Sequence, residues 1–339
     1  MILSKALSRD LLISVGFVAA LALVPIVFPE RYFVGQIITF LIWSMVASQW
    51  NLLMGHAGVF SLAQMAFFAI GAYTTAMASR HLDLSIWMSL PLAVLVAMVS
   101  ALIVGAACLR LHGAYVALLT FAIAEVIHVL IITDTYCYTR EGGGCLQFFG
   151  GATGFSRISD FGFRPFLKGD WILGNYYVVL LAFAFVTLVT MFVMHGRLGL
   201  AFRAIRDNLG YASSRGISRF YTQMTVFAIS AALTGLAGWA YAGHFRFAGP
   251  SLFDFSTLIL VLSMVIVGGL GSIWGPYIGA ATILIGLEWL KEFGDAKNIG
   301  LGLILVLVVL FAPNGLAALF ARLFKHIRPG KNNTPKSRT

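Results

Sequence analysis

Charged side chains are scarce in this chain. They make up 11% of its 339 residues, whereas hydrophobic residues make up 60%. Ordinary soluble domains carry about 25% charged residues, so a soluble fold of this length would lack the polar surface to cover so much apolar material. Several apolar runs reach about 20 residues, enough to cross a hydrocarbon core about 30 Å thick. We therefore predict an all-α integral membrane protein.

The sequence also lacks the motifs that would make it an enzyme. It contains no G-x-x-x-x-G-K-[ST] phosphate loop, no G-x-S-x-G nucleophile turn, no H-E-x-x-H, and no Cys/His cluster at zinc spacing. The chain is therefore expected to be a non-enzyme with no cofactor and no metal, and any ATP hydrolysis must come from another chain. The net charge of +10 lies in loops and tails rather than on one amphipathic face, which argues against a nucleic-acid partner.

About ten apolar segments are long enough to be transmembrane helices. The first follows Lys5 and Arg9 and is too long for a signal peptide, so we expect it to be retained. Segments on one side of the ten-span topology carry 14 of the 23 Lys and Arg residues. This excess places that side, and both termini, in the cytoplasm. The predicted spans are 11–28, 33–53, 62–79, 87–109, 114–133, 172–195, 223–244, 255–270, 275–293 and 299–320.

We predict one transmembrane domain over residues 1–328, followed by a disordered basic cytoplasmic tail at 329–339. Its two hydrophilic insertions are an outer one at 134–171 and an inner, helical one at 196–222. The stretch at 55–61 (GHAGVFS) interrupts what would otherwise be a very long helix, and a break at membrane depth is tolerated where it is buried in protein or faces water.

Glu125 and His128 are the strongly polar pair deep in a predicted span, and their spacing of three residues puts them on one face. Such groups usually face a bundle interior or a wet cavity, although a purely structural role is equally open. Cys137 and Cys145 both lie in the outer insertion. In an oxidising compartment they could form a disulfide or stay reduced.

The inner insertion reads GRLGLAFRAIRDNLGYASSRGIS. Its sequence resembles the cytoplasmic loop of the branched-chain amino-acid ABC permease family (LivM type). The pattern of that loop is roughly G-R-A-W-R-A-I-R-D-N-E-x-A-A-x-x-x-G-I. In that family the segment looks like the coupling helix that docks into the ATPase. Leu209 stands where the family usually has Glu. The resemblance implies coupling roles for Arg203, Arg206, Asp207, Asn208 and Gly216.

Further motifs in the same order extend the resemblance over residues 50 to 290. They include the stretch from Asn51 to Tyr73, which begins NLLMGHAG and contains Gln64. The others are RLHGAY at 110–115, GGATGF at 150–155 and VGGLGSIWGP at 267–276. His128 departs from the family's G-E-I-I-R. The candidate translocation-pathway residues are Glu125, His128, Gln64 and Asn51.

The last motif places glycines at Gly271, Gly275 and Gly279. A repeat of small residues every four positions lets helix backbones approach closely. Two interpretations stay open: helix packing within this chain, or contact with a second permease subunit beside a shared pathway.

The resemblance implies a multi-pass permease subunit of an ABC importer in a bacterial inner membrane, carrying branched-chain or other hydrophobic amino acids. Its partners would be membrane lipid, a second permease, two ATP-binding subunits and a periplasmic substrate-binding protein. A permease for urea or short amides is an alternative, because specificity in this machinery lies largely in the binding protein. A stand-alone secondary carrier is a third, which would need ionisable residues near the midplane of both halves.

Overall fold

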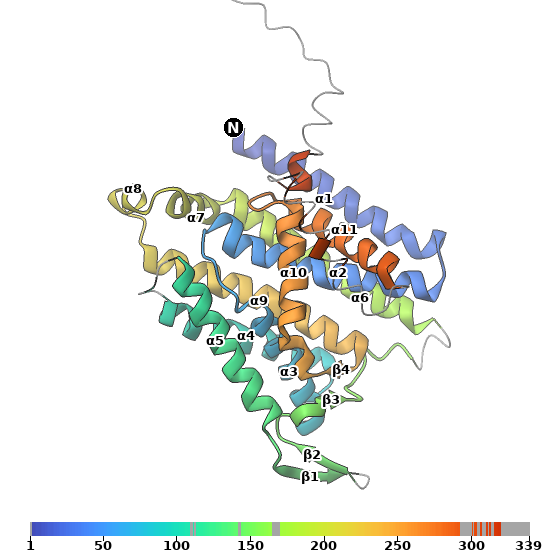
Figure 1. Ribbon diagram of the computed structural model, residues 1–339. Helices are drawn as coiled ribbons and strands as arrows, with labels where there is room; N and C mark the ends of the chain where they lie inside the picture. Colours follow the sequence, from blue (N-terminus) through green and yellow to red (C-terminus); the bar gives the residue numbers. More distant parts are fainter. Residues whose placement is uncertain are drawn as a thin grey trace, which may run out of the picture.

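The computed structural model describes residues 2–108, 111, 113–141, 144–164 and 170–291, together with 300, 302–303, 306, 310, 312 and 315–319. Long helices form a bundle with α7 and α8 at one end (Figure 1). The long helices are α1 (Ile2–Val27), α2 (Arg31–Asn51), α3 (Gln64–His81), α4 (Ile86–Cys108), α5 (Ala114–Ile132), α6 (Trp171–His195) and α9 (Arg219–Phe245). The shorter helices are α7 (Arg197–Asp207), α8 (Leu209–Ser214), α10 (Phe255–Gly268) and α11 (Gly275–Leu290).

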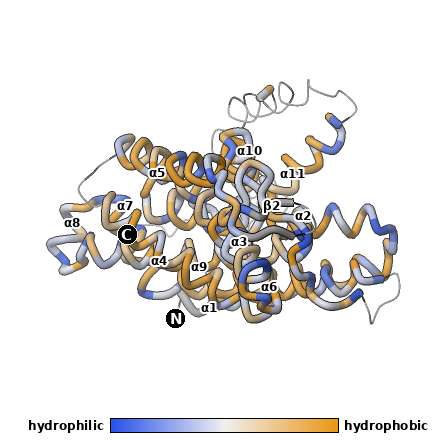
Figure 2. Tube along the Cα trace, turned by 90° about the horizontal axis from the view of Figure 1, so that it is seen from below, coloured by the Kyte–Doolittle hydropathy of each residue, from blue (hydrophilic) through white to orange (hydrophobic). Residues whose placement is uncertain are grey.

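Within the described residues, six helices are long and apolar enough to cross a membrane. Hydrophobic residues run along most of the helical trace (Figure 2). The apolar helices α10 and α11 have 14 and 16 residues, about 21 and 24 Å at 1.5 Å per residue. The chain is therefore a multi-pass helical membrane protein.

Nine of the ten predicted spans correspond to a helix in the described part of the chain. The tenth, at 299–320, falls largely outside the described residues, as does the tail at 329–339. The count of ten spans and the cytoplasmic position of both termini stay predictions. The inner insertion at 196–222 contains α7 and α8.

Helix α2 lies in the core and is tied to its neighbours by buried polar side chains. The Gln49 amide donates to the Thr190 hydroxyl of α6 at 2.8 Å, and the Ser230 hydroxyl of α9 donates to the Gln49 carbonyl at 3.1 Å. Gln64 of α3 accepts from Ser230 at 3.2 Å and donates to Thr234. Because lipid tails are as apolar as the helices themselves, such bonds and close packing hold membrane helices together.

The outer insertion is where the all-α prediction is wrong in detail. Strands β1 (Cys137–Glu141) and β2 (Gly144–Gln147) form an antiparallel hairpin, and β3 (Phe155–Ser156) pairs with β4 (Phe247–Ala248). Gly154 has a φ of 67°, and a Cβ there would lie 2.5 Å from the carbonyl oxygen of Ala248, so glycine allows this close strand contact.

Cys137 is disulfide-bonded, whereas Cys108 is free and buried in α4. The side chain of Cys145 lies outside the described residues, so its pairing with Cys137 stays a prediction.

Candidate functional site

The end of α2 departs from regular helix. Residues Leu52–His56 form a π-helical turn, and the chain does not return to α-helix until Gln64. Gly58 follows with a φ of 70°, in the left-handed region that favours glycine. Single π-helical turns are rare in proteins, and those that occur often lie at functional sites. The interruption predicted at 55–61 is therefore real, and it lies at the same end of the bundle as α7.

Asn51 joins this end of α2 to the turn between α10 and α11. Its side-chain oxygen accepts from the Gly271 N–H at 2.9 Å, and its amide donates to the Ser272 carbonyl at 2.8 Å. A Cβ on Gly55 would lie 2.5 Å from the nitrogen of Gly271. The absence of a side chain at Gly55 therefore allows the two segments to touch.

Helix α7 packs against the π-helical turn at the end of α2. It buries Gly199, Phe202 and Ile205 on one face, and Arg206 projects from that helix to the π-turn. The Arg206 guanidinium donates to the Gly55 carbonyl at 2.6 Å. Gly58 leaves room for the Arg206 stem, because a Cβ there would lie 2.6 Å from its Cγ. The α7 helix, the end of α2 and the α10–α11 turn thus form one connected junction.

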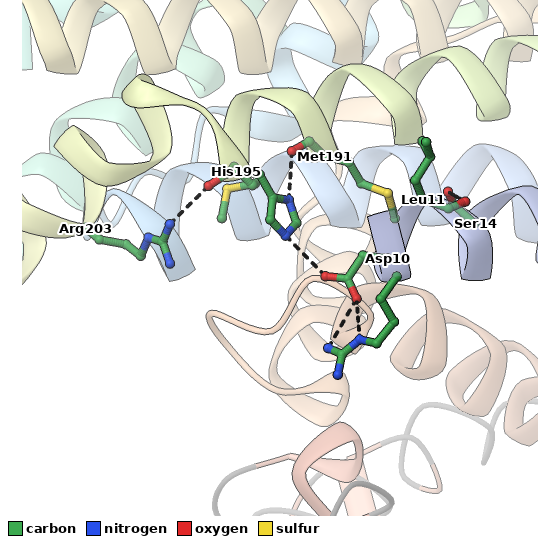
Figure 3. A network of polar contacts seen from close by, with 8 residues as sticks. Asp10, Leu11, Ser14, Met191, His195 and Arg203 are labelled. Atoms are coloured by element: carbon green, nitrogen blue, oxygen red, sulfur yellow. Dashed lines mark hydrogen bonds and ion pairs between the residues drawn. The ribbon is translucent and has the colours of Figure 1, made fainter. Parts of the chain in front are cut away.

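Arg203, for which the resemblance implies a coupling role, makes contacts within the protein. Its guanidinium donates to the Met194 carbonyl in the last turn of α6 at 3.1 Å (Figure 3). It also donates to the Gly199 carbonyl at 3.1 Å. A cation here complements the partial negative charge at a helix C-terminus. Arg203 therefore fixes α7 to α6 and does not face away from the protein.

A second side-chain contact connects the end of α6 to α1. The His195 Nε2 lies 3.2 Å from an Asp10 carboxylate oxygen, while its Nδ1 lies 3.0 Å from the Met191 carbonyl (Figure 3). Asp10 is buried. The sequence gives no local signal for this pair, because its members are 185 positions apart.

The remaining inner-loop candidates occupy the exposed side. Asp207 has a side chain 66% exposed and pairs with Arg206 at 2.9 Å. Asn208 caps α8, accepting from the Tyr211 N–H at 3.0 Å. Gly216 is exposed and has a φ of 81°, so it provides the turn after α8. Beside them a pocket of about 190 Å³ is lined partly by Phe60, Leu209 and Arg219.

Glu125 and His128 lie together on α5. The His128 Nδ1 is 3.3 Å from a Glu125 oxygen, and the His128 ring stacks on Phe253 with centroids 5.7 Å apart. The Glu125 side chain is 37% exposed. An ionisable group at this depth is costly against lipid, so this face of α5 suits contact with protein or water.

The four pathway candidates do not form one site. Gln64 is fully buried in the polar contacts between α3 and α9, and Asn51 belongs to the junction. Neither contributes a bond to the Glu125–His128 pair. Among the residues that the structure describes, no group of three His, Cys, Asp or Glu side chains is arranged to hold a metal ion.

The three glycines do not share one helix. Gly271 lies in the α10–α11 turn with a φ of 76°, and α11 begins at Gly275. Gly279 packs against α10 so closely that a Cβ would lie 1.8 Å from the Met264 carbonyl oxygen. Gly275 and Gly279 therefore serve packing between α10 and α11 within the chain.

Comparison with known proteins gives a consistent result. Residues 32–312 match the family model for the branched-chain amino acid transport system permease component. The high-affinity branched-chain amino acid transport system permease protein LivM of Salmonella typhimurium is 30% identical over 78% of this chain and 65% of its own length. LivM of Escherichia coli gives the same figures. The chain thus spans slightly less than two thirds of the length of these relatives.

The matches to more distant relatives cover a smaller part of this chain and of the relatives. The permease protein LivH of Salmonella typhimurium is 26% identical, and BraD of Pseudomonas aeruginosa is 28% identical. Each match covers 44% of this chain and 53% of the relative. No solved structure matches the chain.

Proposed function

Because this chain belongs to the branched-chain amino acid transport system permease family, we propose that it is the membrane-spanning permease subunit of an ATP-driven importer. Its proposed cargo is branched-chain or other hydrophobic amino acids. The match over residues 32–312 supports the class, and the named relatives are permease proteins of branched-chain amino acid systems. Ten spans in a bacterial inner membrane, with both termini inside, complete the proposed topology.

The proposed machinery contains a second permease, two ATP-binding subunits and a periplasmic binding protein. ATP is hydrolysed by the partner subunits, since the chain carries no phosphate-binding loop of its own. The exposed side of α7 and α8 is the proposed contact with an ATP-binding subunit. The pocket beside Arg206 would receive a side chain of that partner.

The observation that carries the coupling role is the bond from Arg206 to the carbonyl of Gly55. A displacement of α7 by the ATPase would be passed to the end of α2 through this bond. Asn51 would pass it on to the α10–α11 turn. The contacts of Arg203 and His195 would carry α6 and α1 along with it.

The proposed pathway runs along the face of α5 that carries Glu125 and His128. The exposure of Glu125 in an apolar helix supports contact with a second permease across a wet route. A stand-alone carrier would not need an ATPase, so co-purification with one separates the two classes.

Uptake into proteoliposomes tests the assignment. The chain is reconstituted with the proposed second permease and ATP-binding subunits, and the binding protein is added outside. We expect uptake of labelled leucine, isoleucine or valine that requires ATP in the compartment facing α7. The control replaces the phosphate-loop lysine of the ATP-binding subunit and should abolish uptake.

Labelled urea and acetamide are tested in the same vesicles. Transport of these solutes without transport of any amino acid would contradict the proposed cargo. Amino-acid uptake that continues without the ATP-binding subunit would contradict the proposed class.

A further inference from the structure

A groove of about 650 Å³ lies between α1, α2 and α11. Its volume is within the range of about 300–1,000 Å³ typical of small-molecule sites. Most of its lining is apolar or aromatic, including Phe17 of α1, Phe40 of α2 and Trp274 at the start of α11. None of these side chains takes part in the junction at α7.

The polar side chains of the groove gather at one end. Tyr32 and Gln36 come from the first turns of α2, and Glu288 comes from the last turn of α11. Lys291 follows directly after α11. This is the end of α2 opposite to Asn51, so it lies on the far side of the membrane domain from α7.

These four side chains form a small charged cluster. The Gln36 amide donates to a Glu288 oxygen at 3.0 Å, and the Lys291 ammonium lies 2.5 Å from the same oxygen. Lys291 also donates to the Tyr32 hydroxyl at 3.0 Å, and that hydroxyl donates to Glu288. The Lys291 and Glu288 side chains remain 53% and 35% exposed. Glu288 lines the groove and Lys291 pairs with it at the polar end, so both charges are open to a headgroup bound there.

A carboxylate and an ammonium side by side complement a ligand that carries both a phosphate and an ammonium group. An acyl chain gains little by moving from the bilayer into the groove, because lipid tails are as apolar as the lining. Selectivity would therefore come from the polar end. Tyr32 and Trp289, 63% and 78% exposed, are of the aromatic types enriched at the membrane–water interface.

We propose that this groove binds one phospholipid with an ammonium-bearing zwitterionic headgroup, of the phosphatidylethanolamine type. One of its two acyl chains lies along Phe17, Phe40 and Trp274. Its phosphate meets Lys291, and its ammonium meets Glu288. An anionic headgroup without an ammonium is disfavoured because it places a second negative charge beside Glu288. The site depends on the chain spanning a membrane and not on its cargo.

Native mass spectrometry of the assembled transporter tests the proposal. The complex is released from nanodiscs that contain phosphatidylethanolamine and phosphatidylglycerol in equal amounts. We expect one phosphatidylethanolamine to be retained per copy of this chain. Lys291→Ala should lower retention about fivefold, since a cation near the lipid surface contributes about 1 kcal/mol. Glu288→Gln should remove the preference over phosphatidylglycerol.

Two further variants locate the bound lipid. Ala281 lines the groove, so Ala281→Phe should fill it and abolish retention. Arg164→Ala removes a cation from the outer insertion, where it pairs with Asp160, and should leave retention unchanged. Lys291 is largely exposed, so its variant folds even if Ala281→Phe does not.

Unchanged retention in Lys291→Ala and Glu288→Gln would overturn the proposal. So would efficient cross-linking of Ile285→Cys to a second permease subunit, because the groove would then be a protein interface. Loss of transport is not a readout here, which keeps this test separate from that of the importer function.

Discussion

Removing the bond between Arg206 and the Gly55 carbonyl should uncouple ATP hydrolysis from transport. Arg206→Met keeps the aliphatic stem and removes the guanidinium. A hydrogen bond from a charged group contributes about 1.5–3 kcal/mol. The Arg206 side chain is 37% exposed, so water replaces part of the lost bond and the lower end applies. A loss of about 1.5 kcal/mol lowers the equilibrium constant for docking of α7 on the π-turn about tenfold.

The measurement is the amount of labelled leucine taken up per ATP hydrolysed in proteoliposomes of the assembled transporter. We expect this ratio to fall by up to about tenfold for Arg206→Met, with ATP hydrolysis and assembly retained. Arg206→Lys should give an intermediate ratio, because an ammonium keeps the charge but not the planar geometry of the guanidinium.

Arg215→Met is the matched control. It removes the same charge from the same inner loop, but Arg215 donates to the Tyr211 hydroxyl within its own segment at 3.0 Å. Its ratio should equal that of the unmodified protein. Equal losses in both variants would refute the reasoning, because the loss would then follow net charge and not contact with Gly55. An unchanged ratio for Arg206→Met would also refute it.

Three further predictions concern packing and the attachment of α1. Gly55→Ala should lower stability by about 1–3 kcal/mol, since its Cβ would lie 2.5 Å from a nitrogen of the α10–α11 turn, whereas Gly35→Ala meets nothing within 4 Å; thermal unfolding in detergent should lower the midpoint only for Gly55→Ala. Gly279→Ala should also lower the midpoint, because its Cβ would lie 1.8 Å from an α10 carbonyl oxygen, whereas the control Gly16→Ala meets no neighbour within 4 Å. Asp10→Asn removes the charge that faces the histidine of α6, so hydrogen exchange in the first turns of α1 should accelerate while α9 stays protected. Equal exchange in both proteins would contradict the tie between α1 and α6.

The helices could be predicted from the sequence because a long apolar run is a strong local pattern. The expected span at 172–195 and the observed helix Trp171–His195 differ by one residue. The Glu125–His128 contact could also be predicted, because residues three positions apart on a helix lie on the same face.

The junction could not be predicted from the sequence in the same way. Asn51 and Gly271 are 220 positions apart, and Gly55 and Arg206 are 151 apart. Their meeting depends on the packing of α2 against α10 and α7. The motifs that contain them were visible, but nothing local indicates that a backbone carbonyl would receive the arginine.

The glycine repeat shows how a local pattern can mislead. A four-residue spacing suggests one helix through Gly271, but Pro276 occupies the first turn of α11. Proline is favoured at the first positions of a helix because its missing N–H has no partner there. This proline was the available indication that the helix begins at Gly275 and that Gly271 belongs to the turn.

Site-directed cross-linking tests the central claim most directly, namely that α7 and α8 meet the ATP-binding subunit. Tyr211 is 62% exposed on α8, and Tyr136 is 79% exposed beside the β1–β2 hairpin at the other end of the bundle. A cysteine at each position is treated with a short thiol cross-linker in membranes that contain the full transporter. The account predicts that Tyr211→Cys cross-links to the ATP-binding subunit and Tyr136→Cys does not. A cross-link to that subunit from Tyr136→Cys, with none from Tyr211→Cys, would contradict it.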